Sequence, residues 1–188
     1  MTPKEVLDMA KENKAKVVDL RFMDYPGLWQ HFSVPIRELE ESSFEDGFGF
    51  DGSSIRGWQP IHASDMLVIP DPETAKMDPF YAAPTITLIC NIVDPVTREP
   101  YTRDPRNIAQ KADAYLKSTG IGDVVYIGPE AEFFIFDDIR CVSTRFGAFY
   151  EIDAFEGSWK TGRVEGPKLG YNRGHKEGSF RVRPRDLC

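Results

Sequence analysis

The sequence predicts an α+β protein with two domains, and three features of the chain carry this prediction. Strand-like segments separated by turn residues occupy most of the first hundred residues. Helices with clear N-terminal caps are expected at two places, near the start of the chain and after residue 104. Three prolines in the twelve positions of residues 94–105 interrupt both helices and strands. We therefore divide the chain into a domain of residues 1–103 and the beginning of a second domain, residues 104–188.

The first domain is expected to begin with a short helix and a β-hairpin. Residues 2–5 (Thr-Pro-Lys-Glu) have the pattern of a capping box with proline at the first helical position, which predicts a helix through Lys14. Residues 17–22 favour a strand, and an extended pattern resumes over residues 29–34. Between them, residues 24–27 (Asp-Tyr-Pro-Gly) place proline before glycine, as a type II turn requires.

The rest of the first domain is predicted to contain two more strands and long loops. Gly47 and Gly49 indicate a loop that contains Asp51. Residues 66–69 and residues 85–93 are the further strand candidates, joined by a connection rich in proline and aspartate. Four strands, one helix and these loops would form a small α+β domain of about a hundred residues.

The second domain is predicted to open with a helix between an N-cap at Asp104 and Gly120. Apolar residues recur there at helical spacing, at Ile108, Ala112, Tyr115 and Leu116. Strands are expected over residues 124–127, 130–136 and 148–153. Three strands with one covering helix would leave apolar faces unburied, so we expect the chain to be the N-terminal part of something longer.

The composition excludes several classes of protein. Of the 188 residues, 41% are hydrophobic and 28% are charged, which excludes wholesale disorder. The net charge of -7 argues against nonspecific binding to nucleic acid. The longest apolar stretches are too short to span a membrane, and residues 1–5 lack the layout of a secretory signal. Three cysteines without paired spacing fit reduced thiols, so we expect a cytoplasmic protein.

Glu130 and Glu132 are the first candidates for chemistry. Because they are two residues apart in a predicted strand, their carboxylates would leave one face about 7 Å apart. One interpretation is a solvent-facing strand edge, where alternate charges are common. The other is a divalent-metal site, because the aromatic run that follows indicates a covered strand in which two acids would repel each other. Oxygen ligands favour Mg²⁺ or Mn²⁺, although two glutamates do not complete a coordination shell.

The second candidate is the run of residues 50–58 (Phe-Asp-Gly-Ser-Ser-Ile-Arg-Gly-Trp). One interpretation is a turn in which Asp51 and the serines bind local backbone amides. The other is a site where the Asp51 carboxylate, beside hydroxyl oxygens, receives an ammonium ion and takes its proton. The second role requires the loop to face an acceptor.

Three other features are expected to carry no chemistry. The histidines at positions 31, 62 and 175 lack the spacing of a zinc site or a nucleophile–base pair. The cysteines have no local activating pattern. The glycine-rich stretch Gly166–Gly178 matches no phosphate-binding motif, so a surface loop is expected.

Taken together, the residues resemble the bacterial-type glutamine synthetase family. The likeness runs nearly without gaps along most of the chain, and an ordered series of motifs is more specific than either candidate motif alone. It is carried by residues 18–22, 50–55 with 57–58, 64–66, 78–80, 103–106 and 128–134.

This resemblance implies an ATP-dependent ligase that joins ammonia to the side-chain carboxyl of glutamate through a γ-glutamyl phosphate. It implies a β-grasp fold for the first domain and a curved antiparallel sheet, shaped as an open funnel, for the catalytic domain. Glu130 matches a ligand of the Mg²⁺ or Mn²⁺ ion that bridges the transferred phosphoryl group, and Glu132 matches a ligand of the metal that holds glutamate.

The resemblance also implies an assembly. Asp51 and Ser54 match a loop that the first domain lends to the neighbouring subunit's funnel, where the aspartate helps to bind and deprotonate ammonium. The family forms a homododecamer of two stacked hexameric rings, so each active site would be shared between neighbouring subunits.

Two departures from the family pattern qualify these expectations. Family members are more than twice this long, so the remaining metal, nucleotide and glutamate contacts would lie beyond Cys188, and the chain alone is expected to be inactive. Ser179 stands where the family has a tyrosine beside the ammonium pocket, and Arg181 replaces a proline, so no function is carried onto Ser179. Two alternatives stay open: a γ-glutamyl ligase for another amine, and a non-catalytic fragment or assembly module. The run of residues 50–58 favours ammonia.

Overall fold

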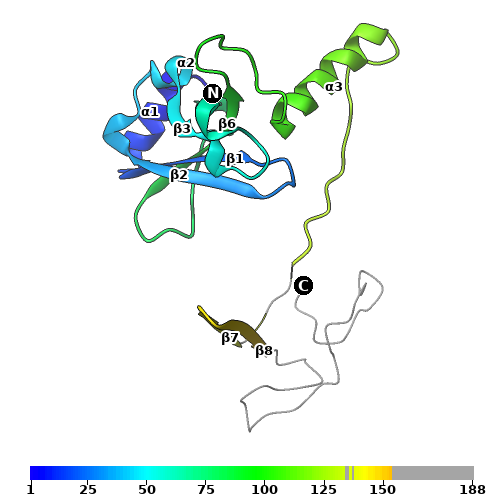
Figure 1. The fold of residues 1–188 in the computed structure, drawn as a ribbon. Coiled ribbons are helices and arrows are strands. Elements are labelled where there is room, and N and C mark those ends of the chain that lie inside the picture. The colour runs from blue at the N-terminus through cyan, green and yellow to red at the C-terminus, as the bar shows by residue number, and fades with distance from the viewer. Residues whose placement is uncertain (134–135, 137, 154–188) are drawn as a thin grey trace, which may run out of the picture. The chain divides into compact units, whose positions relative to one another are not determined.

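The fold is that of a computed structural model, which describes residues 1–133, 136 and 138–153. The chain forms two compact units, Met1–Tyr126 and Ile127–Cys188. The first unit contains a six-stranded sheet with a helix before it and a longer helix after it (Figure 1). Among the described residues, every helix falls short of what a membrane span requires in length and apolar character. The domain division after residue 103 stays a prediction.

The first helix, α1 (Pro3–Glu12), begins at the predicted capping box. Thr2 Oγ1 accepts the backbone N–H of Glu5 at 3.3 Å, and Glu5 Oε2 accepts the N–H of Thr2 at 2.7 Å. These bonds satisfy amides that would otherwise lack a partner in the first turn. Val6 and Ala10 are buried one helical turn apart, so they form the face that packs on the sheet.

The predicted hairpin is confirmed as β1 (Val17–Met23) and β2 (Trp29–Pro35), which pair antiparallel. The turn closes one residue earlier than predicted, because the N–H of Gly27 donates to the Asp24 carbonyl at 3.0 Å and Pro26 therefore occupies the third turn position. Gly27 has a positive φ of 92°, as the predicted role of this glycine requires. The Asp24 side chain explains this shift, since its Oδ1 accepts the N–H of Leu28 at 2.7 Å and draws the turn back by one residue.

Short elements and further strands complete the sheet. They are η1 (Ile36–Glu38), α2 (Ser43–Asp46), β3 (Phe48–Asp51), η2 (Gly52–Ser54), η3 (Ile61–Ala63), β4 (Asp65–Pro70), η4 (Pro72–Thr74), β5 (Lys76–Met77) and β6 (Thr85–Val93), where η marks a 3-10 helix. β4 and β6 confirm two predicted strands. The expectation of a loop from Gly47 up to Asp51 is wrong, because Phe48 and Phe50 pack against the core and this segment pairs with β4. The short strand β5 was not predicted.

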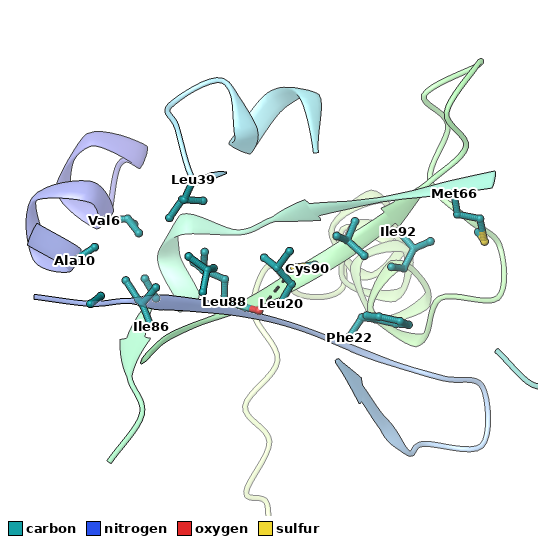
Figure 2. Packing of buried hydrophobic residues seen from close by; sticks show 14 of the residues in the cluster. Val6, Ala10, Leu20, Phe22, Leu39, Met66, Ile86, Leu88, Cys90 and Ile92 are labelled. Carbon is teal, nitrogen blue, oxygen red and sulfur yellow. Dashed lines mark hydrogen bonds between the residues drawn. The ribbon is translucent and has the colours of Figure 1, made fainter. Parts of the chain in front are cut away.

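The strand order is β2-β1-β6-β4-β3, with β5 also paired to β6. β1 and β6 run parallel, whereas the other pairs are antiparallel. β6 is therefore central, and most of its residues are buried, as in a strand covered on both faces. Figure 2 shows Val6 and Ala10 of α1 packed with Leu20 of β1 and with Ile86 and Leu88 of β6. A mixed sheet with a helix across one face agrees with the expected β-grasp fold.

The second long helix, α3 (Pro105–Thr119), begins and ends where the sequence predicts. Asp104 caps it, since its Oδ1 accepts the N–H of Arg106 at 3.0 Å while its Oδ2 accepts the N–H of Ile92 at 3.1 Å. Burial raises the pKa of the Asp104 carboxyl, and these backbone hydrogen bonds oppose the shift. Gly120 ends the helix in a left-handed conformation. One carboxylate thus caps α3 and ties its start to β6.

The second unit contains a hairpin of β7 (Asp138–Thr144) and β8 (Gly147–Asp153). β8 confirms the strand predicted over residues 148–153, whereas β7 was not predicted. The strand predicted over residues 124–127 is wrong, and residues 130–133 likewise have no strand structure. A strand forms only against a partner, and within the described residues nothing pairs with this segment. The predictions for Gly166–Gly178, His175, Ser179, Arg181 and Cys188 lie outside the described residues.

Candidate active site

The first candidate site is the loop of residues 51–58, called here the Asp51 loop. It begins at the last residue of β3, an edge strand of the sheet, and leads toward β4. Asp51 and Ser54 are exposed, whereas Ile55 and Trp58 are 8% and 4% exposed. The loop therefore turns its polar side chains to solvent while its apolar side chains hold it to the core.

The loop itself orients the Asp51 carboxylate. Its Oδ1 accepts the Ser53 hydroxyl at 2.6 Å and the Ser53 N–H at 2.8 Å. The bond from the Ser53 hydroxyl lowers the pKa of Asp51 most, and the N–H of Ser53 and the side chain of Ser64 lower it further. The carboxylate is thus ionised and oriented, which suits a cation. The bond from the Ser53 N–H is the local turn contact that one of the two interpretations of this run expected, but the sequence did not single out the Ser53 hydroxyl. The Ser54 hydroxyl makes no hydrogen bond within the described part of the chain.

A close approach to β4 fixes the start of the loop. The N–H of Gly52 donates to the Ser64 carbonyl at 2.7 Å. A Cβ placed on Gly52 would lie 2.3 Å from Sδ and 2.8 Å from Cγ of Met66, which is only 2% exposed. Glycine at this position is therefore a packing requirement.

An aromatic cluster fixes the end of the loop. The ring centroids of Phe22, Phe50 and Tyr101 lie 5.6, 6.2 and 5.1 Å from that of Trp58. These separations are typical of favourable aromatic pairs. The indole N–H of Trp58 has no hydrogen-bond partner in the described part of the chain. Packing, rather than a side-chain hydrogen bond, therefore holds this ring.

Arg103 adds polar contacts at the same end of the loop. Its Nη1 donates to the carbonyl of Trp58 at 3.0 Å and also to the carbonyl of Gly57, a residue with φ of 79°. These contacts join the Asp51 loop to the segment that precedes α3. Residues 103–106 contribute to the family resemblance, but nothing in the sequence alone indicated this contact.

Glu130 and Glu132, the second candidate site, belong to the second unit. They lie in a segment without strand structure, so the expected placement on one face of a strand is not found. Both side chains are exposed, and neither has a hydrogen bond or ion pair with another described residue. No group of three potential metal ligands occurs among the described residues. Their oxygens suit Mg²⁺ or Mn²⁺, but two carboxylates are too few, and their role stays a prediction.

A third polar group, not predicted from the sequence, surrounds the fully buried side chain of Asp19. It accepts hydrogen bonds from Arg21 Nε at 2.7 Å and the Ser33 hydroxyl at 2.8 Å, and it lies 2.8 Å from His31 Nδ1. Burial would raise the pKa of Asp19, but the bonds with His31, Arg21 and Ser33 outweigh burial and lower it. Arg21 also donates to Asp78 at 2.8 Å. A depression of about 660 Å³ lies over this network. Because its charges already pair with one another, we interpret the network as a support for the β1–β2 pairing.

Comparison with known sequences identifies the family. The profile described as "Glutamine synthetase, beta-Grasp domain" matches residues 14–95, and "Glutamine synthetase, catalytic domain" matches residues 102–188. The glutamine synthetase of Mycobacterium bovis is 53% identical over 98% of this chain and 40% of its own length. That of Microchaete diplosiphon is 52% identical over 98% of this chain and 39% of its own length. The chain thus spans about 40% of these curated relatives.

Comparison with solved structures supports the fold. The cryo-EM structure of Plasmodium falciparum glutamine synthetase matches with a TM-score of 0.74 and 23% sequence identity, over all of this chain and 37% of that one. At this identity the likeness concerns the fold alone. Both family profiles, the identity to the curated relatives and the fold agree: the chain belongs to the glutamine synthetase family, and it carries the β-grasp domain and the first part of the catalytic domain.

Proposed function

We propose that this chain is part of an ATP-dependent ligase that joins ammonia to the side-chain carboxyl of glutamate. The observation that carries the proposal is the Asp51 loop. It holds an ionised and oriented carboxylate, and its buried side chains Ile55 and Trp58 pack against the core. The names of the curated relatives support the same reaction. Because the chain spans about 40% of those relatives, the activity is proposed for the complete enzyme.

In the proposed reaction, the glutamate carboxylate takes the γ-phosphoryl group of ATP and ADP leaves. Nitrogen then forms a bond to the carboxyl carbon of the γ-glutamyl phosphate, and phosphate departs with the electrons of the C–O bond. An ammonium ion has no lone pair, so it must lose a proton for this attack. The lowered pKa of Asp51 keeps the carboxylate charged, which favours binding of the cation. The carboxylate takes one proton to free the nitrogen lone pair, and the departing phosphate takes the second proton that amide formation releases. We assign Ser54 to the same proposed ammonium-binding site.

We assign Glu130 and Glu132 as carboxylate ligands of Mg²⁺ or Mn²⁺. When bound, these ions neutralise the charge that develops on the phosphoryl oxygens. The exposed carboxylates, which have no competing partner among the described residues, fit this use. The other ligands must come from outside the described residues.

We also propose a homo-oligomer whose active sites are shared between neighbouring subunits, a dodecamer as in the family. The Asp51 loop supports this proposal, because Asp51 and Ser54 face no second catalytic group within the described part of the first unit. A second subunit would provide that group. We propose a cytoplasmic location, in keeping with the free thiols of Cys90 and Cys141.

Glutamine formation by the complete enzyme tests this function. We expect Glu130→Gln to lower kcat/KM by at least about 10³-fold. The metal that neutralises the charge on the transferred phosphoryl group would lose one of its carboxylate ligands. Glu12→Gln is the matched control, since Glu12 is exposed on α1, and it should stay within about twofold of the wild type. Activity of Glu130→Gln within a few-fold of the wild type would show that the metal assignment is wrong. A preference for another amine over ammonium would replace the proposed substrate.

A further inference from the structure

We propose that Arg103 is a positioning residue that holds the Asp51 loop in its ammonium-binding conformation. This inference rests on the proposed function, and it gives a role to a residue that touches neither Asp51 nor Ser54 in the structure. The contact that carries it is the pair of hydrogen bonds from Arg103 Nη1 to the carbonyls of Gly57 and Trp58.

The end of the loop depends on these bonds because its own hydrogen bonds are few. The N–H of Ile55 donates to Gly52 at 3.2 Å, and the N–H of Trp58 donates to Ile55 at 3.1 Å. Among the described residues, only Arg103 donates a hydrogen bond to the carbonyls of Gly57 and Trp58. Without it, these carbonyls would keep only the solvent as a partner.

Arg103 can act as a clamp because its own segment is fixed to the central strand. The N–H of Tyr101 donates to the carbonyl of Ile92 at 2.8 Å, and Asp104 Oδ2 accepts the N–H of the same residue. Asn107 Nδ2 donates to the Tyr101 carbonyl at 2.8 Å. The backbone around Arg103 is thus hydrogen-bonded to β6 through Tyr101 before it and Asp104 after it. Arg103 therefore holds the end of the loop against the core of the first unit.

The clamp also connects the two parts that the family profiles distinguish. The Asp51 loop lies in the β-grasp match, residues 14–95, whereas Arg103 lies in the catalytic-domain match, residues 102–188. Both belong to one compact unit, Met1–Tyr126. The position of the loop is therefore set in part by Arg103, a residue from the beginning of the catalytic-domain match.

The chemistry of arginine predicts which kinetic parameter depends on the clamp. The bonds from Ser53 to Asp51 lie within the loop, so loss of Arg103 leaves the Asp51 carboxylate oriented locally but loosens the end of the loop at Gly57 and Trp58, which packing alone then holds. Binding of ammonium should weaken, whereas binding of ATP and glutamate should not. Lysine keeps the charge but not the planar guanidinium, so Arg103→Lys should restore only part of the effect.

Hydrogen–deuterium exchange of the 188-residue chain tests the clamp without any activity. We expect Arg103→Gln to speed exchange over residues 52–58 by roughly tenfold, because hydrogen bonds from a charged donor are lost, and to leave β6 unchanged. Arg98→Gln is the matched control. Arg98 donates to the carbonyls of Glu45 and Asp46 in the same manner, so its loss should affect residues 43–48 and not residues 52–58. Unchanged exchange over residues 52–58 in Arg103→Gln would overturn the clamp.

Steady-state kinetics of the complete enzyme then test the positioning role. We expect Arg103→Gln to raise the KM for ammonium by about tenfold with kcat changed by less than about threefold, and Arg103→Lys to fall between it and the wild type. Asp51→Asn, run in parallel, separates the two proposals. If Asp51→Asn loses activity while Arg103→Gln keeps the wild-type KM for ammonium, the positioning role is wrong and the proposed function stands. If Asp51→Asn keeps full activity, the role of the loop in the proposed function is wrong.

Discussion

The Asp51 loop and the segment of residues 128–133 hold the two sets of candidate catalytic residues, and they differ in what fixes them. The Asp51 loop is held by the close approach of Gly52 to Met66, by the ring of Trp58 and by Arg103. Residues 128–133 have no regular structure and are exposed. The difference indicates that the Asp51 loop is held by contacts within the first unit, whereas residues 128–133 have no such support among the described residues.

The largest expected effect on the free energy of unfolding comes from removing one aromatic side chain in each region. Trp58→Ala should lower the free energy of unfolding by about 3–5 kcal/mol, because Trp58 is 4% exposed and its loss leaves a cavity. Phe133→Ala should change it by less than about 0.5 kcal/mol, because Phe133 is 71% exposed. Urea unfolding followed by far-UV circular dichroism measures both. Equal losses would show that the core does not anchor the Asp51 loop.

The next effect compares one glycine from each region. Gly52→Ala should lower the free energy of unfolding by about 1–3 kcal/mol, because its Cβ overlaps the buried side chain of Met66. Gly128→Ala should be close to neutral, because a Cβ there meets no atom within 4 Å. Thermal unfolding of the two variants measures the difference. A neutral Gly52→Ala would mean that the Met66 side chain of β4 moves aside at no cost, so the close approach of Gly52 to Met66 would not fix the start of the loop.

The smallest effect concerns the charge on the loop. Ser53 lowers the pKa of Asp51, so Ser53→Ala should raise that pKa, and the carboxylate should take up a proton at a higher pH than in the wild type. Ser54→Ala is the control, because its hydroxyl makes no hydrogen bond among the described residues, and it should leave the titration of Asp51 unchanged. Side-chain ¹³C NMR across the acidic pH range reports both titrations. An equal shift in the two variants would remove Ser53 from its orienting role.

Local signals in the sequence predicted the helices well, because caps act within one turn. Thr2 and Asp104 mark the beginnings of α1 and α3, and both make the expected hydrogen bonds. Strands were less predictable, because a strand requires a partner elsewhere in the chain. Gly47 and Gly49 indicated a loop, but pairing with β4 makes residues 48–51 a strand. The apolar run at residues 124–127 indicated a strand and lacks a partner among the described residues.

The sequence named candidate site residues, but it did not indicate the contacts that support them. Asp51 and Ser54 are candidates through the family resemblance, and their role stays a prediction; Asp51 lies on an exposed, anchored loop. The contact between Arg103 and Trp58 spans 45 residues of sequence, so no local pattern could indicate it. Ser53 was overlooked because two adjacent serines are equivalent in a sequence, and only the turn geometry of η2 directs one of them to the carboxylate.

The parallel pairing of β1 with β6 constrains the order in which the domain is assembled during translation. The β1–β2 hairpin is complete once residue 35 has left the ribosome, but its parallel neighbour begins only at residue 85. At a synthesis rate of about 5–20 residues per second, roughly 3–10 seconds pass before β6 can pair with the exposed edge of β1. Until then, Leu20 has no neighbour from the middle of the sheet, and this interval is when the emerging polypeptide is most open to a chaperone or to wrong pairing.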